Sequence, residues 1–141
     1  MSFLIDTNVI SEVTRPKPNS DVIAFLHEVD EDRLFMSVIT IGELRRGVAL
    51  KAEGKARSAL DAWLRFDLVE RFSGRIIDIT PPVAERWGEL MAAAKRQGVA
   101  LHVMDGFLAA TALTHNHTLV TRNVRDFRRF DVPLLNPWDA A

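Results

Sequence analysis

Short apolar runs alternate along this chain with longer segments in which apolar residues recur at helical spacing. The runs are brief and rich in aliphatic residues, a pattern typical of buried strands, and they cover residues 2–5, 34–36, 75–79 and 118–121. Apolar residues three or four positions apart predict helices over residues 8–13, 21–29, 39–52, 59–66, 80–98 and 104–114. The apolar tail over residues 133–138 is expected to dock on the body as an edge strand.

The order of these elements indicates an α/β fold. Strands that alternate with helices form a parallel sheet with helices on both faces. We therefore expect a three-layer α/β/α arrangement around a central parallel sheet of four or five strands. The chain has no internal repeat, linker or low-complexity segment, and 141 residues fit one compact domain, here residues 1–141.

Composition excludes several classes of protein. The formal net charge is -1, so the molecule as a whole is not a basic nucleic-acid binder. The chain has no cysteine, which excludes disulfides and thiolate chemistry. Its first apolar run is too short and too soon acidic for a signal peptide, and no apolar stretch reaches the roughly 18 residues of a membrane span. The sequence therefore predicts a cytoplasmic protein without membrane segments.

Arginine residues cluster in two segments of the chain. The planar guanidinium group suits bidentate contacts with phosphate, although such clustering by itself more often marks a solvated face. The clustered arginines are Arg45, Arg46, Arg122, Arg125, Arg128 and Arg129.

Carboxylates follow the predicted strands. In open parallel sheets the active site lies beyond the carboxyl ends of the strands. Asp6 directly follows the first strand, Glu43 comes soon after the second, and Asp105 opens the helix before the last long strand. Asn123 and Asp126 follow that strand. Parallel strands bring these side chains to one edge, where we expect them to converge.

Each of these residues also has a purely structural explanation. Asp6 suits a helix N-cap, and Asp105 suits the positive end of a helix dipole. Thr40 and Glu43 have the spacing of a capping box, in which the Glu43 side chain would reach back to the Thr40 N–H. Asp126 suits a surface charge or a local partner for Arg129.

The combination favours a metal site over four unrelated caps. Clustered carboxylates repel one another, which raises their pKa values unless a cation is present. A hard divalent cation such as Mg²⁺ or Mn²⁺ takes oxygen ligands and resolves this conflict. Such a metal activates a water molecule and neutralises charge on a phosphate under attack, while nearby arginines would hold the flanking phosphates of a nucleic acid.

Four segments, in order, resemble the motifs of the PIN-domain family. They are IDTNVISE at 5–12, SVITIGELRRG at 37–47, MDGFLAATA at 104–112 and LVTRNVRDF at 119–127. The ending NPW at 136–138 resembles one branch of the family, the VapC and FitB-like toxins. The resemblance covers nearly the whole chain. Many relatives have a proline before the third acid, where this sequence has Met104.

This resemblance implies a PIN-like fold and metal-binding carboxylates at Asp6, Glu43 and Asp105. The fourth acidic position of the family falls at Asn123, with Asp126 three residues on as an alternative. Thr7 and Thr121 resemble hydroxyl positions that orient metal-bound water. Candidate contacts with RNA or with a protein inhibitor are Arg45, Arg46, Arg122 and Arg125.

The function that the resemblance implies is endonucleolytic cleavage of RNA with Mg²⁺ or Mn²⁺, by the toxin of a toxin–antitoxin pair. Members of this kind are similar in forming homodimers and in being silenced by a cognate antitoxin protein. Operator DNA would be bound only through that antitoxin, because this chain has no further domain for reading DNA.

Two other functions compete with this hypothesis. The chain could act chiefly as a subunit of a DNA-binding repressor complex with weak or no nuclease activity, and Asn123 is the feature that favours this alternative. A carboxylate phosphatase built on Asp6 is weakened by Asn8, where a second Asp is expected. His115 and His117 lack a third ligand at usable spacing, and His102 is interpreted as a loop residue rather than a base.

Overall fold

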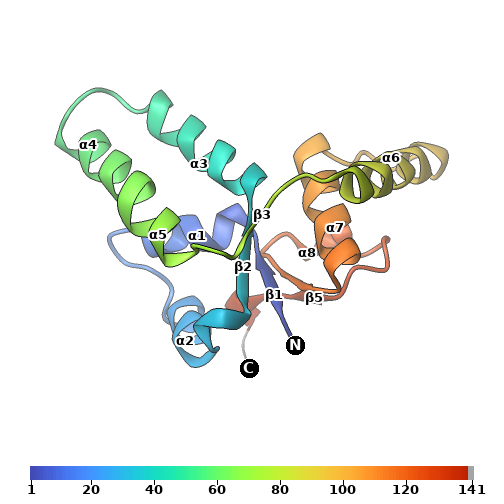
Figure 1. Ribbon diagram of the computed structural model, residues 1–141, viewed down its shortest axis with the longest axis horizontal. Helices are drawn as coiled ribbons and strands as arrows, with labels where there is room; N and C mark the ends of the chain where they lie inside the picture. The colour runs from blue at the N-terminus through green and yellow to red at the C-terminus, as the bar shows by residue number, and fades with distance from the viewer. Residues whose placement is uncertain (140–141) are drawn as a thin grey trace.

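The computed structural model describes residues 1–139 and contains a five-stranded, all-parallel sheet (Figure 1). The strand order is β3-β2-β1-β4-β5, which places β1 at the centre with β2 and β4 as its neighbours. The strands are β1 (Phe3–Ile5), β2 (Leu34–Ser37), β3 (Ile76–Ile77), β4 (Thr118–Val120) and β5 (Leu134–Leu135). The predicted parallel sheet is confirmed, and the apolar tail does form an edge strand.

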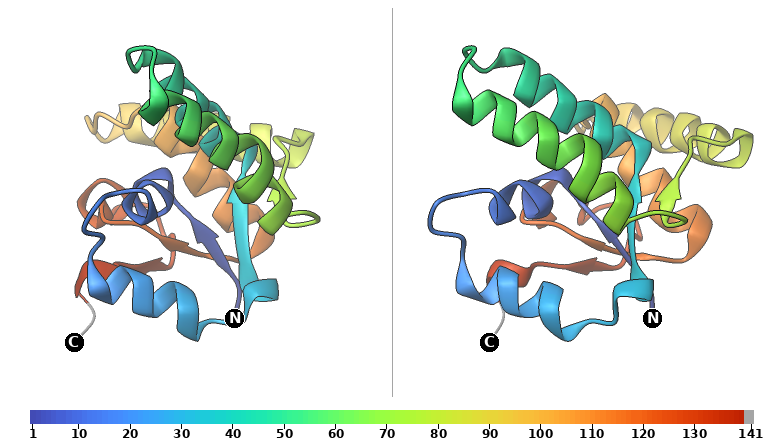
Figure 2. Two further views of the ribbon diagram at one scale, coloured as in Figure 1. Left: turned by 90° about the vertical axis from the view of Figure 1, so that its left-hand side faces the viewer. Right: turned by 60° about the vertical axis from the view of Figure 1, so that its left-hand side comes forward.

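Helices cover both faces of the sheet (Figures 1 and 2). The longer ones are α1 (Thr7–Val13), α2 (Ser20–Glu28), α3 (Val38–Leu50), α4 (Lys55–Ala62), α6 (Pro81–Arg96) and α7 (Val103–His115). Shorter ones are η1 (Glu31–Arg33), η2 (Trp63–Leu68), α5 (Val69–Arg71), α8 (Val124–Phe127) and η3 (Pro137–Asp139). The three-layer α/β/α fold is therefore confirmed.

Alternating side chains of β1 point into two separate cores, because successive residues of a strand face opposite sides. Phe3 and Ile5 pack with residues of α1, α2, α3 and η2. Leu4 packs on the other face with residues of α6, α7 and α8. All three strand residues are buried, which explains why the first apolar run shows no polar alternation.

One helical segment differs from its prediction. A helix was expected over residues 59–66, but the helical segment begins at Lys55 and passes through a π-helix at η2 before it ends at Arg71. Gly54 precedes it with a φ of 152°, a backbone conformation that L side chains rarely adopt. A π-helix has more residues per turn than an α-helix, so apolar residues within it no longer recur at the 3.6-residue spacing. The prediction therefore ended the helix at residue 66, inside the π-helical segment.

Close packing of α7 against α6 fixes where α7 begins. The Trp87 ring stacks on the Phe107 ring with centroids 4.7 Å apart, and its Nε1 donates to the Val103 carbonyl at 3.2 Å. Gly106 is buried beneath these groups. A Cβ atom at Gly106 would lie 2.8 Å from Met91 Sδ and 3.1 Å from the Trp87 ring. The first turn of α7, which carries Asp105, is thus held by a contact that needs glycine.

Among the helices of residues 1–139, none has both the length and the apolar character needed to cross a membrane.

Replacement by alanine should have opposite effects on stability at Gly88 and at Gly106. Gly88→Ala in α6 meets nothing within 4 Å and is expected to raise the free energy of unfolding by about 0.5–1 kcal/mol through helix propensity. Gly106→Ala is expected to lower it by about 1 kcal/mol or more, because the stacked and hydrogen-bonded Trp87 cannot move aside freely. Urea denaturation of both variants measures the difference, and equal stabilisation would contradict the packing role of Gly106.

Candidate active site

Asp6 lies at the carboxyl end of the central strand and is 5% exposed. It is the N-cap of α1, and its Oδ1 accepts a hydrogen bond from the Thr7 N–H at 2.6 Å. Its Oδ2 accepts from Thr121 Oγ1 at 2.7 Å and from Asn8 Nδ2 at 3.4 Å. The capping explanation and the site explanation therefore both apply to Asp6, since one oxygen caps the helix and the other faces residues from β4.

Burial raises the pKa of Asp6 from 3.8 to about 6. Hydrogen bonds from Thr121 and Thr7 oppose this rise, while the nearby carboxylates of Asp105 and Glu43 add to it. The carboxylates that the sequence distributes over three segments thus interact electrostatically in the folded chain. Their mutual repulsion is the effect that a bound cation would relieve.

Glu43 lies on α3 and is connected to the Asp6 region through Thr7. Thr7 Oγ1 donates to Glu43 Oε1 at 2.7 Å and lies 3.2 Å from Thr40 Oγ1. The capping-box alternative for Thr40 and Glu43 is wrong, because α3 begins three residues earlier than a Thr40 cap requires and its N-cap is Ser37, whose side chain accepts from the Ile39 N–H at 3.0 Å. Glu43 is therefore free of a capping role.

Asp105 lies in the first turn of α7 and approaches the site from the opposite face of the sheet. Burial raises its pKa; the His102 imidazole opposes this, and the carboxylates of Glu43 and Asp126 add to it. His102, interpreted from the sequence as a loop residue, is the N-cap of α7, and its Nδ1 accepts from the Met104 N–H at 3.3 Å.

Asn123 and Asp126 interact with each other rather than with the central carboxylate. Asn123 Nδ2 donates to Asp126 Oδ2 at 2.8 Å, and the Asn123 N–H donates to Thr121 Oγ1 at 2.9 Å. Asp126 is exposed, as expected of a surface charge, but in the described chain it forms no ion pair with Arg129, the other structural alternative from the sequence. Thr121 thus joins this pair to Asp6, since its hydroxyl contacts both.

The four candidate arginines separate in the structure. Arg45 Nη1 contacts Asp61 Oδ1 at 2.5 Å, so Arg45 serves the packing of α3 against α4. Arg46, the next residue, lines a cavity that Glu43 and Thr7 also line. The Arg122 guanidinium lies 5.0 Å from the centre of the Trp138 ring. Arg125 lines a second depression together with Asp126 and Arg129.

Sequence reasoning missed two residues of the site. Asn8 was used only as an argument against a phosphatase, yet its amide contacts both Asp6 and Thr121, and its Oδ1 accepts from the Arg122 N–H at 3.4 Å. Thr40 is fully buried beside Thr7. The spacing of Asn8, two residues after Asp6 at the first turn of a helix, was the available signal.

The donor set suits a hard cation. Carboxylate and hydroxyl oxygens dominate it, and oxygen atoms are the preferred ligands of Mg²⁺ and Mn²⁺. Within residues 1–139, no three His, Asp or Glu side chains are arranged so that they could hold a metal ion by themselves. Magnesium commonly binds through one or two carboxylates and keeps several waters, so Asp6 with Asp105 or Glu43 fits such an ion.

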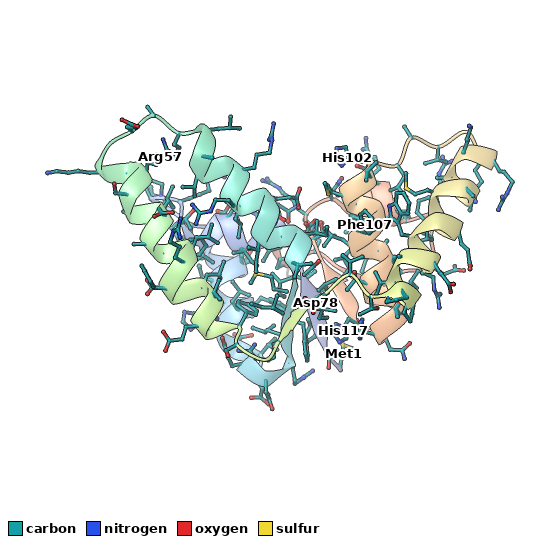
Figure 3. The ribbon with its side chains drawn as sticks, turned by 45° about the horizontal axis from the view of Figure 1, so that its top comes forward. Met1, Arg57, Asp78, His102, Phe107 and His117 are labelled. Atoms are coloured by element: carbon teal, nitrogen blue, oxygen red, sulfur yellow. The ribbon has the colours of Figure 1, made fainter. Side chains whose placement is uncertain are left out.

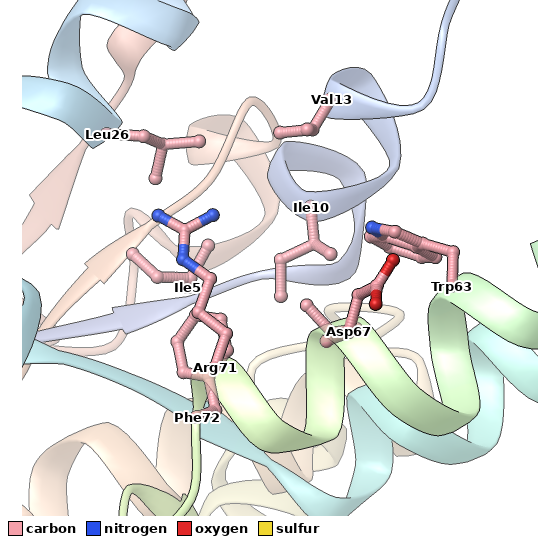
Figure 4. Close-up of a pocket in the computed structure, with 9 residues that line it drawn as sticks. Ile5, Ile10, Val13, Leu26, Trp63, Asp67, Arg71 and Phe72 are labelled. Carbon is pink, nitrogen blue, oxygen red and sulfur yellow. The ribbon is translucent and has the colours of Figure 1, made fainter.

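A separate apolar cavity of about 250 Å³ lies between α1, α2 and η2 (Figure 4). The π-helix contributes much of its rim, where the Asp67 carboxylate lies near the Trp63 indole, while the Arg71 guanidinium extends toward Leu26. Apolar side chains form most of its lining, which consists of Ile5, Ile10, Val13, Leu26, Trp63, Asp67, Leu68, Arg71 and Phe72.

The raised pKa of Asp6 predicts how stability depends on pH. Above pH 6 the ionised, buried carboxylate opposes folding, and the difference between 3.8 and about 6 corresponds to about 3 kcal/mol. This cost diminishes as the pH falls from 6 toward 3.8, because folded Asp6 takes up a proton before the unfolded chain does. Asp6→Asn should therefore stabilise the metal-free protein at pH 7.5, by up to about 3 kcal/mol, and by less at pH 4.5.

Urea denaturation in EDTA at both pH values measures this effect, with the exposed Asp131→Asn as the matched control. If Asp6→Asn lowers the free energy of unfolding at pH 7.5, or raises it equally at both pH values, the raised pKa of Asp6 is contradicted.

Comparisons with known proteins agree with this geometry. The PIN domain family model matches residues 3–133. The chain is 41% identical to toxin FitB of Neisseria gonorrhoeae over 96% of this chain and 98% of that protein. It is 33% identical to VapC ribonuclease Y4jK of Sinorhizobium fredii, over 99% of each chain. The structure of FitAB bound to an IR36 DNA fragment superposes with a TM-score of 0.93 at 38% identity, over 99% of this chain and 97% of the other. The chain therefore belongs to the PIN-domain family.

Proposed function

We propose that this chain is a divalent-metal-dependent endoribonuclease and the toxin of a toxin–antitoxin pair. The observation that carries the proposal is the Asp6 carboxylate at the carboxyl end of β1. Burial raises its pKa, and the nearby carboxylates of Asp105 and Glu43 raise it further. The similarity to relatives named as a VapC ribonuclease and as toxin FitB supports RNA as the substrate class and toxin as the role.

The protein groups have separate tasks in this proposal. Asp6 and Asp105 would hold the Mg²⁺ or Mn²⁺ ion, and Glu43 would bind it or position its water. When bound, the ion activates a water molecule and neutralises charge on the phosphate under attack. Thr121 orients the Asp6 carboxylate through the 2.7 Å hydrogen bond, and Thr7 orients Glu43 in the same way. Asn123 stands where the family has a fourth acid and could supply a neutral ligand or a water contact, but no charge.

Arginines on both sides of the carboxylates suit contacts with RNA, Arg122 and Arg125 with the flanking phosphates and Arg46 with the part of the strand that enters its cavity. Arg46, Arg122 and Arg125 form no ion pair with another residue of 1–139. Phosphate oxygens accept hydrogen bonds from guanidinium groups in sequence-independent contacts. We do not propose a phosphate contact for Arg45, because its guanidinium already forms an ion pair with Asp61.

The proposed regulator is a cognate antitoxin, which would fill the apolar cavity between α1, α2 and η2 with a side chain and block the neighbouring carboxylates. That cavity is apolar inside with charged groups at its rim, which suits an amphipathic segment. The DNA in the FitAB structure supports operator binding through the partner protein. We also propose that the chain forms a homodimer and acts in the cytoplasm.

One observation favours the second candidate, a repressor subunit with little nuclease activity. Asn123 donates to Asp126, so the fourth position supplies no charge, and Asp126 is occupied by that hydrogen bond. A protein of this kind would form a DNA complex with its antitoxin and would cut no RNA under any divalent metal.

Cleavage of RNA by the purified chain separates the two candidates. Wild type with Mg²⁺ or Mn²⁺ is expected to cut, EDTA to stop it, and Asp6→Asn to lose at least a hundredfold in rate, in line with losing a group that stabilises transition-state charge. Circular dichroism must show that the variant is folded. Full activity of folded Asp6→Asn, or inactivity of folded wild type, would remove the nuclease assignment.

The hydroxyl of Thr7 should matter for activity through Glu43. Thr7→Val keeps the side-chain shape but removes the donor to Glu43 Oε1, and a hydrogen bond to a charged group contributes about 1.5–3 kcal/mol. We expect kcat to fall about tenfold or more in Thr7→Val and to recover largely in Thr7→Ser, as measured under single-turnover conditions. Equal rates for Thr7→Val and wild type would show that Thr7 does not position Glu43.

A further inference from the structure

A cavity of about 660 Å³ opens beside the carboxylates, between the first turns of α3 and α7. Thr7 and Glu43 line it, so it is continuous with the candidate active site. Its volume falls in the range of pockets that hold small organic groups. The other lining residues come from the N-terminal part and middle of α3 and from the start of α7, and they are Val38, Ile39, Gly42, Arg46, His102 and Met104.

The walls of this cavity are apolar and adaptable. Val38 and Ile39 are only partly buried on the α3 side, and the Met104 side chain is 37% exposed on the α7 side. Methionine is flexible and polarisable, and it makes favourable contacts with aromatic groups. Gly42 adds space, since a Cβ atom there would meet nothing within 4 Å. A flat group with apolar faces can therefore lie between the two helix starts.

Two planar groups with hydrogen-bond donors complete the cavity. His102 Nδ1 accepts from the Met104 N–H, so the neutral imidazole carries its proton on Nε2, where it is available to a ligand. Among residues 1–139, none forms an ion pair with Arg46 or His102. Guanidinium and imidazole planes are the surfaces on which proteins stack unpaired bases.

Building on the ribonuclease activity proposed above, we propose that this cavity receives one unpaired nucleobase of the RNA, next to the phosphate at the carboxylates. His102, Met104 and Arg46 then act as specificity-determining residues. A base has the required apolar faces and a polar edge that accepts hydrogen bonds. A base inside a duplex is stacked and paired and cannot enter a cavity between two helices, so the nucleotide at the cut must be unpaired.

A phosphate fits this cavity less well than a base. The Glu43 carboxylate lines it and would repel a phosphate, and the walls of Val38, Ile39 and Met104 offer no hydrogen bonds from their side chains. A purely apolar ligand would cover the exposed Arg46 and His102 donors without giving them hydrogen-bond partners, and burying an unpaired polar group is costly.

Binding without metal tests the pocket independently of cleavage. Short single-stranded RNAs with 2-aminopurine at one position each, and the same RNAs annealed to their complement, are titrated in EDTA. For one position of the single strand, we expect binding to change 2-aminopurine fluorescence, and we expect the duplex to give no such change. A variant that no longer stacks one base should bind the single strand with a Kd about tenfold higher.

Two variants of the cavity keep the fold by design. His102→Asn removes the ring but retains a side chain that caps a helix well. Gly42→Leu fills the cavity from α3 without a clash at its Cβ and improves helix propensity. Gly88→Leu, on the open surface of α6, is the matched control. Arg57→Gln on α4, across the molecule from His102 (Figure 3), is the charge control for Arg46→Gln.

Both cavity variants and Arg46→Gln are expected to weaken binding about tenfold, and both controls to bind as wild type. On single-stranded RNA of random sequence with Mg²⁺, His102→Asn should also change the base preferred at one position beside the cut. If wild type cuts no RNA but the binding pattern holds, the base pocket stands while the nuclease proposal falls. Equal binding of duplex and single strand, or unchanged binding and base preference in both His102→Asn and Gly42→Leu, would overturn the base pocket.

Discussion

The hydrogen bond from Thr121 Oγ1 to Asp6 is the contact on which the site depends. It joins the ends of β1 and β4, which are neighbours in space but 115 residues apart in the chain. The strand order reverses direction between these two strands, and such a switch point leaves a crevice where ligands bind in open α/β sheets. A buried carboxylate there has few partners, so each hydrogen bond to it determines both its position and its pKa.

The two layers of helices bring the remaining groups to this crevice from opposite faces. Glu43 comes from α3, directly after β2, and Asp105 from α7, whose start is fixed by the packing of Gly106 under Trp87. The three carboxylates therefore depend on two independent cores. Repulsion between these like charges reduces the stability of the metal-free chain. Such a cost is common at functional sites, because binding needs groups that destabilise the fold when no ligand is present.

The same arrangement gives the crevice two sides of different chemistry. On the α3 and α7 side, apolar walls with the Arg46 and His102 donors suit a base. On the β4 side, Arg122 and Arg125 lie near Asn123 and Asp126 and suit phosphates. An inhibitor docked at the apolar cavity by η2 would lie on the third side, next to α1. In the proposed function, the substrate and the regulator would thus lie around one carboxylate.

The sequence by itself determined the fold class and predicted the carboxylates of the candidate site. Its apolar runs were long enough to identify four strands, and carboxylates placed directly after strands or at helix starts must meet at one sheet edge because parallel strands all end there. It also assigned Asp6, Glu43 and Asp105 to that edge.

Only the tertiary structure decided the partners of those residues. Local spacing matched Glu43 to a capping box, but the true start of α3 at Val38 and the hydroxyl of Thr7 gave it another partner. In the sequence, Arg45 and Arg46 are equivalent candidates for contacts with RNA. In the structure, Arg45 pairs with Asp61, whereas Arg46 lines the cavity. The π-helix and the contacts of Asn8 with Asp6 and Thr121 were likewise decided only by the fold. The physical reason is that helix phase and contacts between distant segments are set by packing, which local propensity does not encode.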